Sequence, residues 1–270
     1  MTCARRAPRT WGARLLECAA MLGPLAAVLL SAAAAARDPA FVAVIDPGHG
    51  GEQCGATAPG GEHEKDLALR IAQRVSQRLK RIGAKVILTR TGDISVPLAN
   101  RAAIANAIRA DLFLSIHLNS MPTAEERRVS KGVETYFLSA GATDSHASAV
   151  SARENADRLA GEPVTDPNDP VAAILNDLES AAALQASSRL AYAVHDKLVS
   201  QLGAEDRGVK QAPFYVLAGA RMPAVLVEVG FVSHAEEAAR LGTAEYQEKV
   251  AQAIADGIAA WRSQTRAAAR

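Results

Sequence analysis

The chain has 270 residues and a formal net charge of +1, with 49% hydrophobic and only 4% aromatic residues. A near-neutral chain without a basic patch excludes the nucleic-acid-binding classes that depend on clustered Lys and Arg. The length suits one domain with a leader or an insertion, and the core has to be built mainly from Ala, Val, Leu and Ile.

Residues 1–36 have the pattern of a secretory signal peptide. Basic residues precede an apolar stretch at 21–30, and a run of alanines ends at Ala36. The apolar stretch is about 10–14 residues long, whereas a spanning helix needs roughly 20. We therefore expect cleavage after Ala36 and no membrane span in the mature chain. An uncleaved anchor is the alternative, and Arg5-Arg6 leaves a twin-arginine signal open.

Residues 42–51, with the sequence VAVIDPGHGG, predict a buried strand that runs into a glycine-rich loop. An uninterrupted apolar run is typical of a strand covered on both faces in a parallel sheet, and Pro47 ends it. His49 then stands beyond the carboxyl end of the strand, where ligands bind in open α/β sheets. A single histidine in such a position is, taken alone, more often an ordinary loop residue.

The segments that follow alternate between helix and strand patterns. The helix pattern occurs at residues 64–82 and 97–109, and the strand pattern at 85–90, 111–117 and 132–138. Apolar residues recur every three or four positions along the first helix. This order predicts an α/β fold with a mostly parallel, twisted sheet of about six strands and helices on both faces.

Residues 139–202 interrupt this alternation. They are rich in Ala, Ser, Asp and Glu and lack strand patterning. We predict a helical insertion between two strands, with helices near 147–159 and over 171–202 and a proline-containing loop at 162–170. Strand patterns return at 214–217 and 224–228, and a last helix is predicted at 244–261. Connections of this length are usually functional or disordered.

Several chemistry-bearing residues are expected to meet at one crevice. His49 and His117 both stand where buried strands end, and Glu64 lies in the first turn of the helix that the His49 loop enters. Two imidazoles and one carboxylate suit a catalytic zinc site with an open fourth position. His63 competes with Glu64, because adjacent helical side chains point about 100° apart. Glu228 ends another apolar strand, where a carboxylate beside a metal suits a general base.

Seven short motifs follow one another along the chain. They are VIDPGHGG at 44–51, EK at 64–65, LTR at 88–90, SIHLN at 115–119, GVE at 132–134, RGVK at 207–210 and VEVGFVS at 227–233. In this order they resemble the zinc-dependent N-acetylmuramoyl-L-alanine amidases of the type 3 family, over about residues 41–261. Leu118 and Val229 depart from the family pattern, and neither changes a ligand type.

The resemblance implies a zinc-dependent hydrolase that cleaves the amide between N-acetylmuramic acid and L-alanine in peptidoglycan, in cell-wall remodelling or daughter-cell separation. By position, the Zn²⁺ ligands and then the catalytic carboxylate would be His49, Glu64, His117 and Glu228. Asn119 and Arg101 are further candidates for substrate binding. A zinc peptidase acting within the stem peptide and a non-catalytic peptidoglycan-binding module are the alternative functions.

The insertion resembles a regulatory segment of the cell-division amidases of Gram-negative periplasms. In those enzymes a helix blocks the zinc site until an activator with a degenerate metallopeptidase domain displaces it. Residues 152–157 resemble part of that helix, which makes Glu154 the expected inhibitory residue; a solvated helix face is the alternative. The resemblance thus implies a periplasmic or otherwise exported catalytic domain at 37–270, with the insertion at about 139–202.

Overall fold

The computed structural model describes residues 41–157 and 170–268. The predicted signal peptide at 1–36 lies outside the described residues. So does the predicted loop at 162–170, apart from Pro170, which begins a helix. Among the described residues, every helix falls short of the combined length and apolar character that a membrane span requires.

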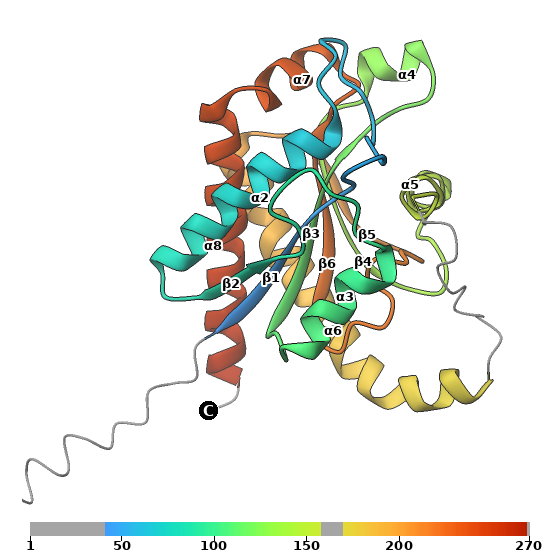
Figure 1. The fold of residues 1–270 in the computed structure, drawn as a ribbon, viewed down its shortest axis with the longest axis vertical. Coiled ribbons are helices and arrows are strands. Elements are labelled where there is room, and N and C mark those ends of the chain that lie inside the picture. The colour runs from blue at the N-terminus through green and yellow to red at the C-terminus, as the bar shows by residue number, and fades with distance from the viewer. Residues whose placement is uncertain (1–40, 158–169, 269–270) are drawn as a thin grey trace, which may run out of the picture. The chain divides into compact units, whose positions relative to one another are not determined.

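A six-stranded sheet organises the chain from Phe41 onwards (Figure 1). Its strands lie in the order β2 (Lys85–Leu88), β1 (Val42–Pro47), β3 (Leu112–Asn119), β6 (Ala224–Phe231), β4 (Val133–Leu138) and β5 (Asp206–Ala212). β4 runs antiparallel to β6, and the other neighbouring pairs are parallel. The prediction of a mostly parallel sheet of about six strands is confirmed.

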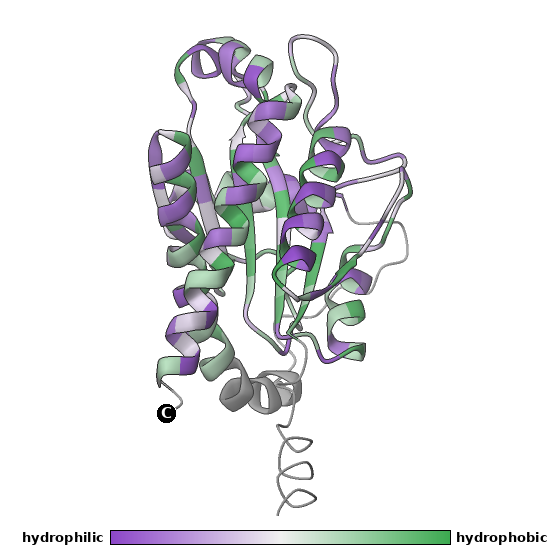
Figure 2. Cartoon of the chain, turned by 90° about the vertical axis from the view of Figure 1, so that its left-hand side faces the viewer, coloured by the Kyte–Doolittle hydropathy of each residue, from purple (hydrophilic) through white to green (hydrophobic). Residues whose placement is uncertain are grey.

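Helices cover both faces of the sheet. On one face lie α2 (Glu64–Arg81), α6 (Pro170–Leu202) and α8 (Ala244–Ala268), and on the other lie α3 (Leu98–Ala107) and α5 (Ser145–Asn155). Along β1, Ala43 and Ile45 join the core under α2 and α8, whereas Val44 joins the core under α3. Figure 2 shows the hydrophobic strands between helices whose outer sides are hydrophilic. Two short helices, α4 (Ala124–Val129) and α7 (Ala235–Leu241), complete the set among the described residues.

The helix that begins at Glu64 follows directly from its sequence. Its buried side includes Leu67, Ile71, Val75 and Leu79 at helical spacing. Full burial of each such side chain contributes about 1.5–3 kcal/mol, so α2 is firmly fixed on the sheet. Acidic residues lie in its first turn and basic residues in its last, as the helix dipole favours.

The strand predicted at 214–217 is wrong. These residues form successive turns, in which Leu217 N donates to Phe214 O at 3.1 Å. Phe214 and Leu217 are nevertheless buried, so their apolar character reflects packing of a turn against the core. The strand lies earlier, as β5, and its half-exposed, polar sequence suits the edge of the sheet.

The direction of β4 decides how the insertion reaches the rest of the molecule. Because β4 is antiparallel to β6, the carboxyl end of β4 points in the direction opposite to the carboxyl ends of β1 and β3. The chain then folds back along β5, where Thr143 N donates to Gln211 O at 2.9 Å. This return path carries α5 towards the carboxyl ends of the central strands.

Candidate metal centre

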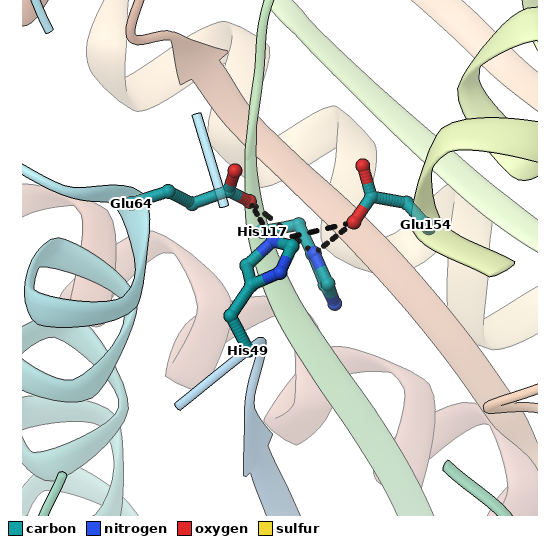
Figure 3. A group of neighbouring side chains, drawn as sticks. All are labelled: His49, Glu64, His117 and Glu154. Carbon is teal, nitrogen blue, oxygen red and sulfur yellow. Dashed lines mark ion pairs between the residues drawn. The ribbon is translucent and has the colours of Figure 1, made fainter. Parts of the chain in front are cut away.

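Four side chains from separate parts of the chain converge beyond the carboxyl ends of β1 and β3 (Figure 3). They are His49, Glu64, His117 and Glu154, and one ligand atom from each lies within 4.8 Å of the others. His49 Nε2 is 2.8 Å from Glu64 Oε1, and His117 Nδ1 is 2.9 Å from Glu154 Oε2. A tetrahedral ion with bonds of about 2.0–2.1 Å separates its ligand atoms by roughly 3.3 Å. The cluster therefore has the size of such a site.

The atoms that face one another in this cluster are buried and lack hydrogen-bond partners. They are His49 Nε2, His117 Nδ1 and Glu154 Oε2. Because buried polar atoms are normally hydrogen-bonded, their shared focus fits a bound cation. Glu64 is aimed at the same point by the backbone, since Leu118 N donates to its Oε1 at 2.8 Å and Ala56 N to its Oε2 at 2.9 Å. This donor set can hold a metal ion.

The charges in the cluster favour a cation at its centre. Burial alone lowers the pKa of His117, but Glu154 and Glu64 together raise that pKa to about 9. Burial likewise raises the pKa of Glu64, but His49 and His117 together lower that pKa to about 2. The carboxylates thus stabilise positive charge, which a metal ion supplies when the imidazoles are neutral ligands.

The loop after β1 brings its histidine close to the others because it contains glycine. A Cβ atom at Gly48 would lie only 2.5–2.7 Å from the ring of His117. At Gly55, where φ is +65°, a Cβ atom would lie 2.7 Å from both Glu64 Oε2 and His49 Cδ2. Glycine at positions 48 and 55 is therefore required for the close approach of the cluster's side chains.

Glu228 lies beside the cluster without joining it. It pairs with His117 in the register between β3 and β6. Its side chain is fully buried, and neither carboxylate oxygen has a hydrogen-bond partner. Burial, and then the nearby Glu154, raises the pKa of Glu228 well above its usual 4.5. A buried carboxyl group with a raised pKa beside a metal-type cluster is suited to proton transfer.

Asp157 is a site residue that the sequence analysis missed. It follows α5 and hydrogen-bonds His49 Nδ1, while His49 Nε2 faces the cluster. Histidines that bind metals generally donate their second ring N–H to a carboxylate or carbonyl. The spacing of three residues between Glu154 and Asp157 places both on one side of a helix, and this spacing was the available signal.

Two other residues considered from the sequence lie outside the cluster. Arg101 is only 2% exposed, and its guanidinium donates to the carbonyls of Pro47 and His49 at 2.9 and 2.8 Å. We therefore propose that Arg101 supports the His49 loop and does not contact the substrate. His63 precedes α2 and bonds Thr57 at 3.1 Å, so Glu64, and not His63, joins the cluster.

Polar contacts hold α5 over the cluster. Arg153 donates to Ser120 O at 2.8 Å and to Asn119 Oδ1 at 3.0 Å. At the end of α5, Asn155 donates to Pro213 O and accepts from Tyr215 N, both at 2.8 Å. Asn119 is thus fully buried beneath α5.

A second buried carboxylate, Glu134 in β4, ties α5 to the sheet. His146 of α5 lies 3.1 Å from Glu134 Oε2. From the sheet, Asn119 Nδ2 and Tyr136 OH donate to the same oxygen at 2.7 and 2.8 Å, and Arg207 Nε donates to Oε1 at 2.8 Å. Burial opposes ionisation, but His146 and then Arg207 lower the pKa of Glu134 to about 2.

Comparisons with known proteins agree on one family. The family profile described as N-acetylmuramoyl-L-alanine amidase (Amidase_3) matches residues 43–260. Over 219 residues the chain is 37% identical to N-acetylmuramoyl-L-alanine amidase AmiA of Escherichia coli K12, covering 80% of this chain and 74% of AmiA.

Solved structures give the same picture. The N-acetylmuramoyl-L-alanine amidase from Clostridium difficile 630 matches with a TM-score of 0.64 and 28% identity, over 84% of this chain and 98% of that one. The CwlD amidase from Clostridioides difficile, solved in complex with the GerS lipoprotein, matches with a TM-score of 0.61 and 26% identity, over 83% and 98% of the two chains.

Proposed function

The chain belongs to the N-acetylmuramoyl-L-alanine amidase family, and from this we propose that it hydrolyses the amide bond between N-acetylmuramic acid and L-alanine in peptidoglycan. The observation that carries the proposal is the convergence of His49, Glu64 and His117, with Glu228 beside them. We propose cell-wall remodelling or daughter-cell separation as the process in which it acts.

The cofactor that we propose is Zn²⁺, held by His49 Nε2, Glu64 Oε1 and His117 Nδ1. Nitrogen and carboxylate ligands in a three-residue set with an open position are typical of catalytic zinc. When bound, zinc supplies Lewis-acid activation of a carbonyl group and of water. The two backbone N–H groups that grip Glu64 hold its carboxylate in the ligating orientation.

Glu228 is the proposed proton carrier. Its raised pKa suits a group that accepts a proton from the attacking water and returns it to the departing amine of L-alanine. Because neither of its oxygens is engaged in a hydrogen bond, both can bond the reacting groups once α5 has moved. Asn119 is a proposed substrate contact once α5 has moved, since its Oδ1 then no longer accepts the hydrogen bond from Arg153.

We further propose that α5 is a built-in inhibitor. Glu154 lies in the cluster where the fourth position of a zinc site would be, and Arg153 lies 3.9 Å from Glu228 Oε1. Both the metal position and the proton carrier are therefore covered. An activator that binds displaced α5 more tightly than docked α5 shifts the equilibrium by that difference in affinity. We propose a partner with a degenerate metallopeptidase domain for this role. That the CwlD amidase forms a complex with the GerS lipoprotein supports a protein partner.

Export is part of the same proposal. Peptidoglycan lies outside the cytoplasmic membrane, and the signal-peptide pattern at 1–36 would deliver the mature chain there. We propose the periplasm as the location.

Digestion of purified muropeptides and sacculi, read by mass spectrometry, tests the function. The mature protein and Glu154→Ala are each assayed with and without a chelator, and Glu154→Ala carrying Glu228→Gln is the inactive control. We expect Glu154→Ala to release stem peptides with a free L-alanine amine, and the chelator to stop it. Fragments cut within the stem would identify a peptidase instead, and binding without any product would identify a non-catalytic module.

A further inference from the structure

Arg90, just after β2, is a buried cation that the proposed mechanism does not use. Its side chain is among the largest that are fully buried, with 1% exposed. Among the described residues it donates to four backbone carbonyls, those of Pro47, Gly48, Lys65 and Gly92. Burial, and then the neighbouring Arg101, lowers the pKa of Arg90 to about 10, so it remains charged at neutral pH. Burying a charge costs solvation free energy, which the hydrogen bonds of Arg90 must offset.

The contacts of Arg90 join the two segments that carry His49 and Glu64. One nitrogen, Nη2, donates to Gly48 O and to Lys65 O, both at 2.7 Å. Gly48 directly precedes His49, and Lys65 directly follows Glu64. A single planar group therefore sets the distance between the loop after β1 and the first turn of α2.

The loop after β1 needs such support because its backbone is unusual. His49 has a φ of +58°, in the left-handed region that residues with side chains rarely adopt. Three successive carbonyls of this loop accept hydrogen bonds from Arg90 and Arg101. Pro47 O accepts from both guanidiniums, Gly48 O from Arg90, and His49 O from Arg101.

The two arginines differ in one respect. Arg101 donates to Pro47, His49, Val96 and Asp46, so it holds the loop but has no recorded bond to α2. Arg90 holds the loop and also reaches Lys65 in α2. Substitutions of Arg101 therefore test support of the loop alone, whereas substitutions of Arg90 also test the spacing between the loop and α2.

We propose that Arg90 is a positioning residue that fixes the spacing of His49 and Glu64 for metal binding. The inference rests on the proposed metal centre. A lysine at this position keeps the charge but replaces the planar fork with a compact ammonium on a flexible stem. It cannot hold all four carbonyls in the same geometry, so the ligand spacing should relax.

The test compares the mature Arg90→Lys and Arg101→Lys proteins with wild type and with Arg78→Lys, a substitution at the far end of α2. Zinc affinity is measured by chelator competition, and the Co²⁺-loaded proteins are compared by visible absorption. Supporting residues of a metal site typically change affinity by about 10–100-fold. We expect Arg90→Lys to lose about tenfold and to alter the Co²⁺ spectrum, Arg101→Lys to lose less, and Arg78→Lys to match wild type.

The outcomes separate this inference from the metal centre itself. Wild-type affinity and an unchanged Co²⁺ spectrum in Arg90→Lys would overturn the positioning role and leave the metal centre intact, as would equal losses in Arg90→Lys and Arg101→Lys. A wild-type protein that fails to bind zinc would overturn the metal centre. Arg90→Gln, which leaves no displaced charge in the interior, is measured in parallel in case Arg90→Lys does not fold, and the same tenfold loss is expected of it.

Discussion

Glu64 and Glu154 reach the same cluster from helices that are held in different ways. α2 buries four large aliphatic side chains against the sheet, whereas the apolar residues that α5 buries are Ala147 and Val150. Burying a large aliphatic side chain contributes about 1.5–3 kcal/mol, and a hydrogen bond contributes a net of only about 0.5–1.5 kcal/mol. Two carboxylates of similar burial are therefore fixed to very different degrees.

The same contrast extends to their surroundings. Glu64 is gripped by backbone N–H groups of the fold itself. α5 is held by side-chain contacts such as those of Arg153 and Asn155, which water or a partner protein can replace. The difference supports the proposal that α2 carries a permanent ligand and α5 a removable one.

The largest effect on turnover is expected at Glu228, which lies on the sheet and not on α5. Glu228→Gln, made in the Glu154→Ala background so that α5 does not mask the rate, should lose about 10²–10⁴-fold in turnover. Zinc content should stay unchanged, because Glu228 is not a ligand in the cluster. Rates on sacculi and metal analysis check this. Undiminished turnover would place the proton acceptor elsewhere.

A smaller effect, on the free energy of unfolding, is expected at Glu134, which is bonded both by the sheet and by α5. Its pKa is about 2 in the folded protein, against an ordinary 4.5. A carboxyl group with a lowered pKa stabilises the fold above pH 4.5 and loses that contribution as the pH falls towards 2. The difference corresponds to roughly 3 kcal/mol at most. Glu134→Gln should therefore destabilise the zinc-free protein strongly at pH 7 and much less at pH 3.

Urea unfolding at the two pH values measures this, with His146→Gln as the matched control. His146 is the donor that α5 supplies to Glu134. Its loss leaves the sheet-side donors Asn119, Tyr136 and Arg207 on the carboxylate, so it should lower global stability less than Glu134→Gln does. Equal destabilisation by both substitutions would mean that α5 is as much a part of the core as β4, which would contradict its weaker attachment.

The smallest expected effect concerns the attachment of α5. Asn155→Ala removes the two hydrogen bonds that join the end of α5 to Pro213 and Tyr215. At about 0.5–1.5 kcal/mol each, their loss should raise the basal rate by roughly tenfold at unchanged zinc content. Ser148→Ala, at an exposed position of α5, is the control. An unchanged rate in Asn155→Ala would show that these bonds do not hold the closed state.

The central part of the molecule could be predicted because its signals are local. The apolar runs of β1, β3 and β6 end in His49, His117 and Glu228, and parallel strands bring such ends to one edge. The strand β5 could not be found in this way, because an edge strand buries too little to need an apolar run. The strand was predicted at the apolar residues 214–217 instead, although a turn can bury such residues equally well.

The supporting residues of the site were also beyond local signals. Arg101 has the sequence character of a surface residue, and its burial depends on carbonyls more than fifty positions away. α4 was missed although Thr123 and Glu126 form a capping box, whose spacing can be recognised in a sequence. Asp157 shares the helical spacing of Glu154, but its contact with His49 across the fold requires the structure.

We propose that Glu64 is a permanent ligand and Glu154 a removable inhibitor. The most direct test is to measure initial rates on isolated sacculi, without a partner protein, for wild type, Glu64→Ala and Glu154→Ala, with the zinc content of each. We predict opposite signs. Glu64→Ala should lose zinc and all cleavage, whereas Glu154→Ala should keep zinc and cleave faster than a nearly inactive wild type. A wild type as fast as Glu154→Ala, or a Glu154→Ala protein that loses zinc and activity as Glu64→Ala does, would contradict the claim.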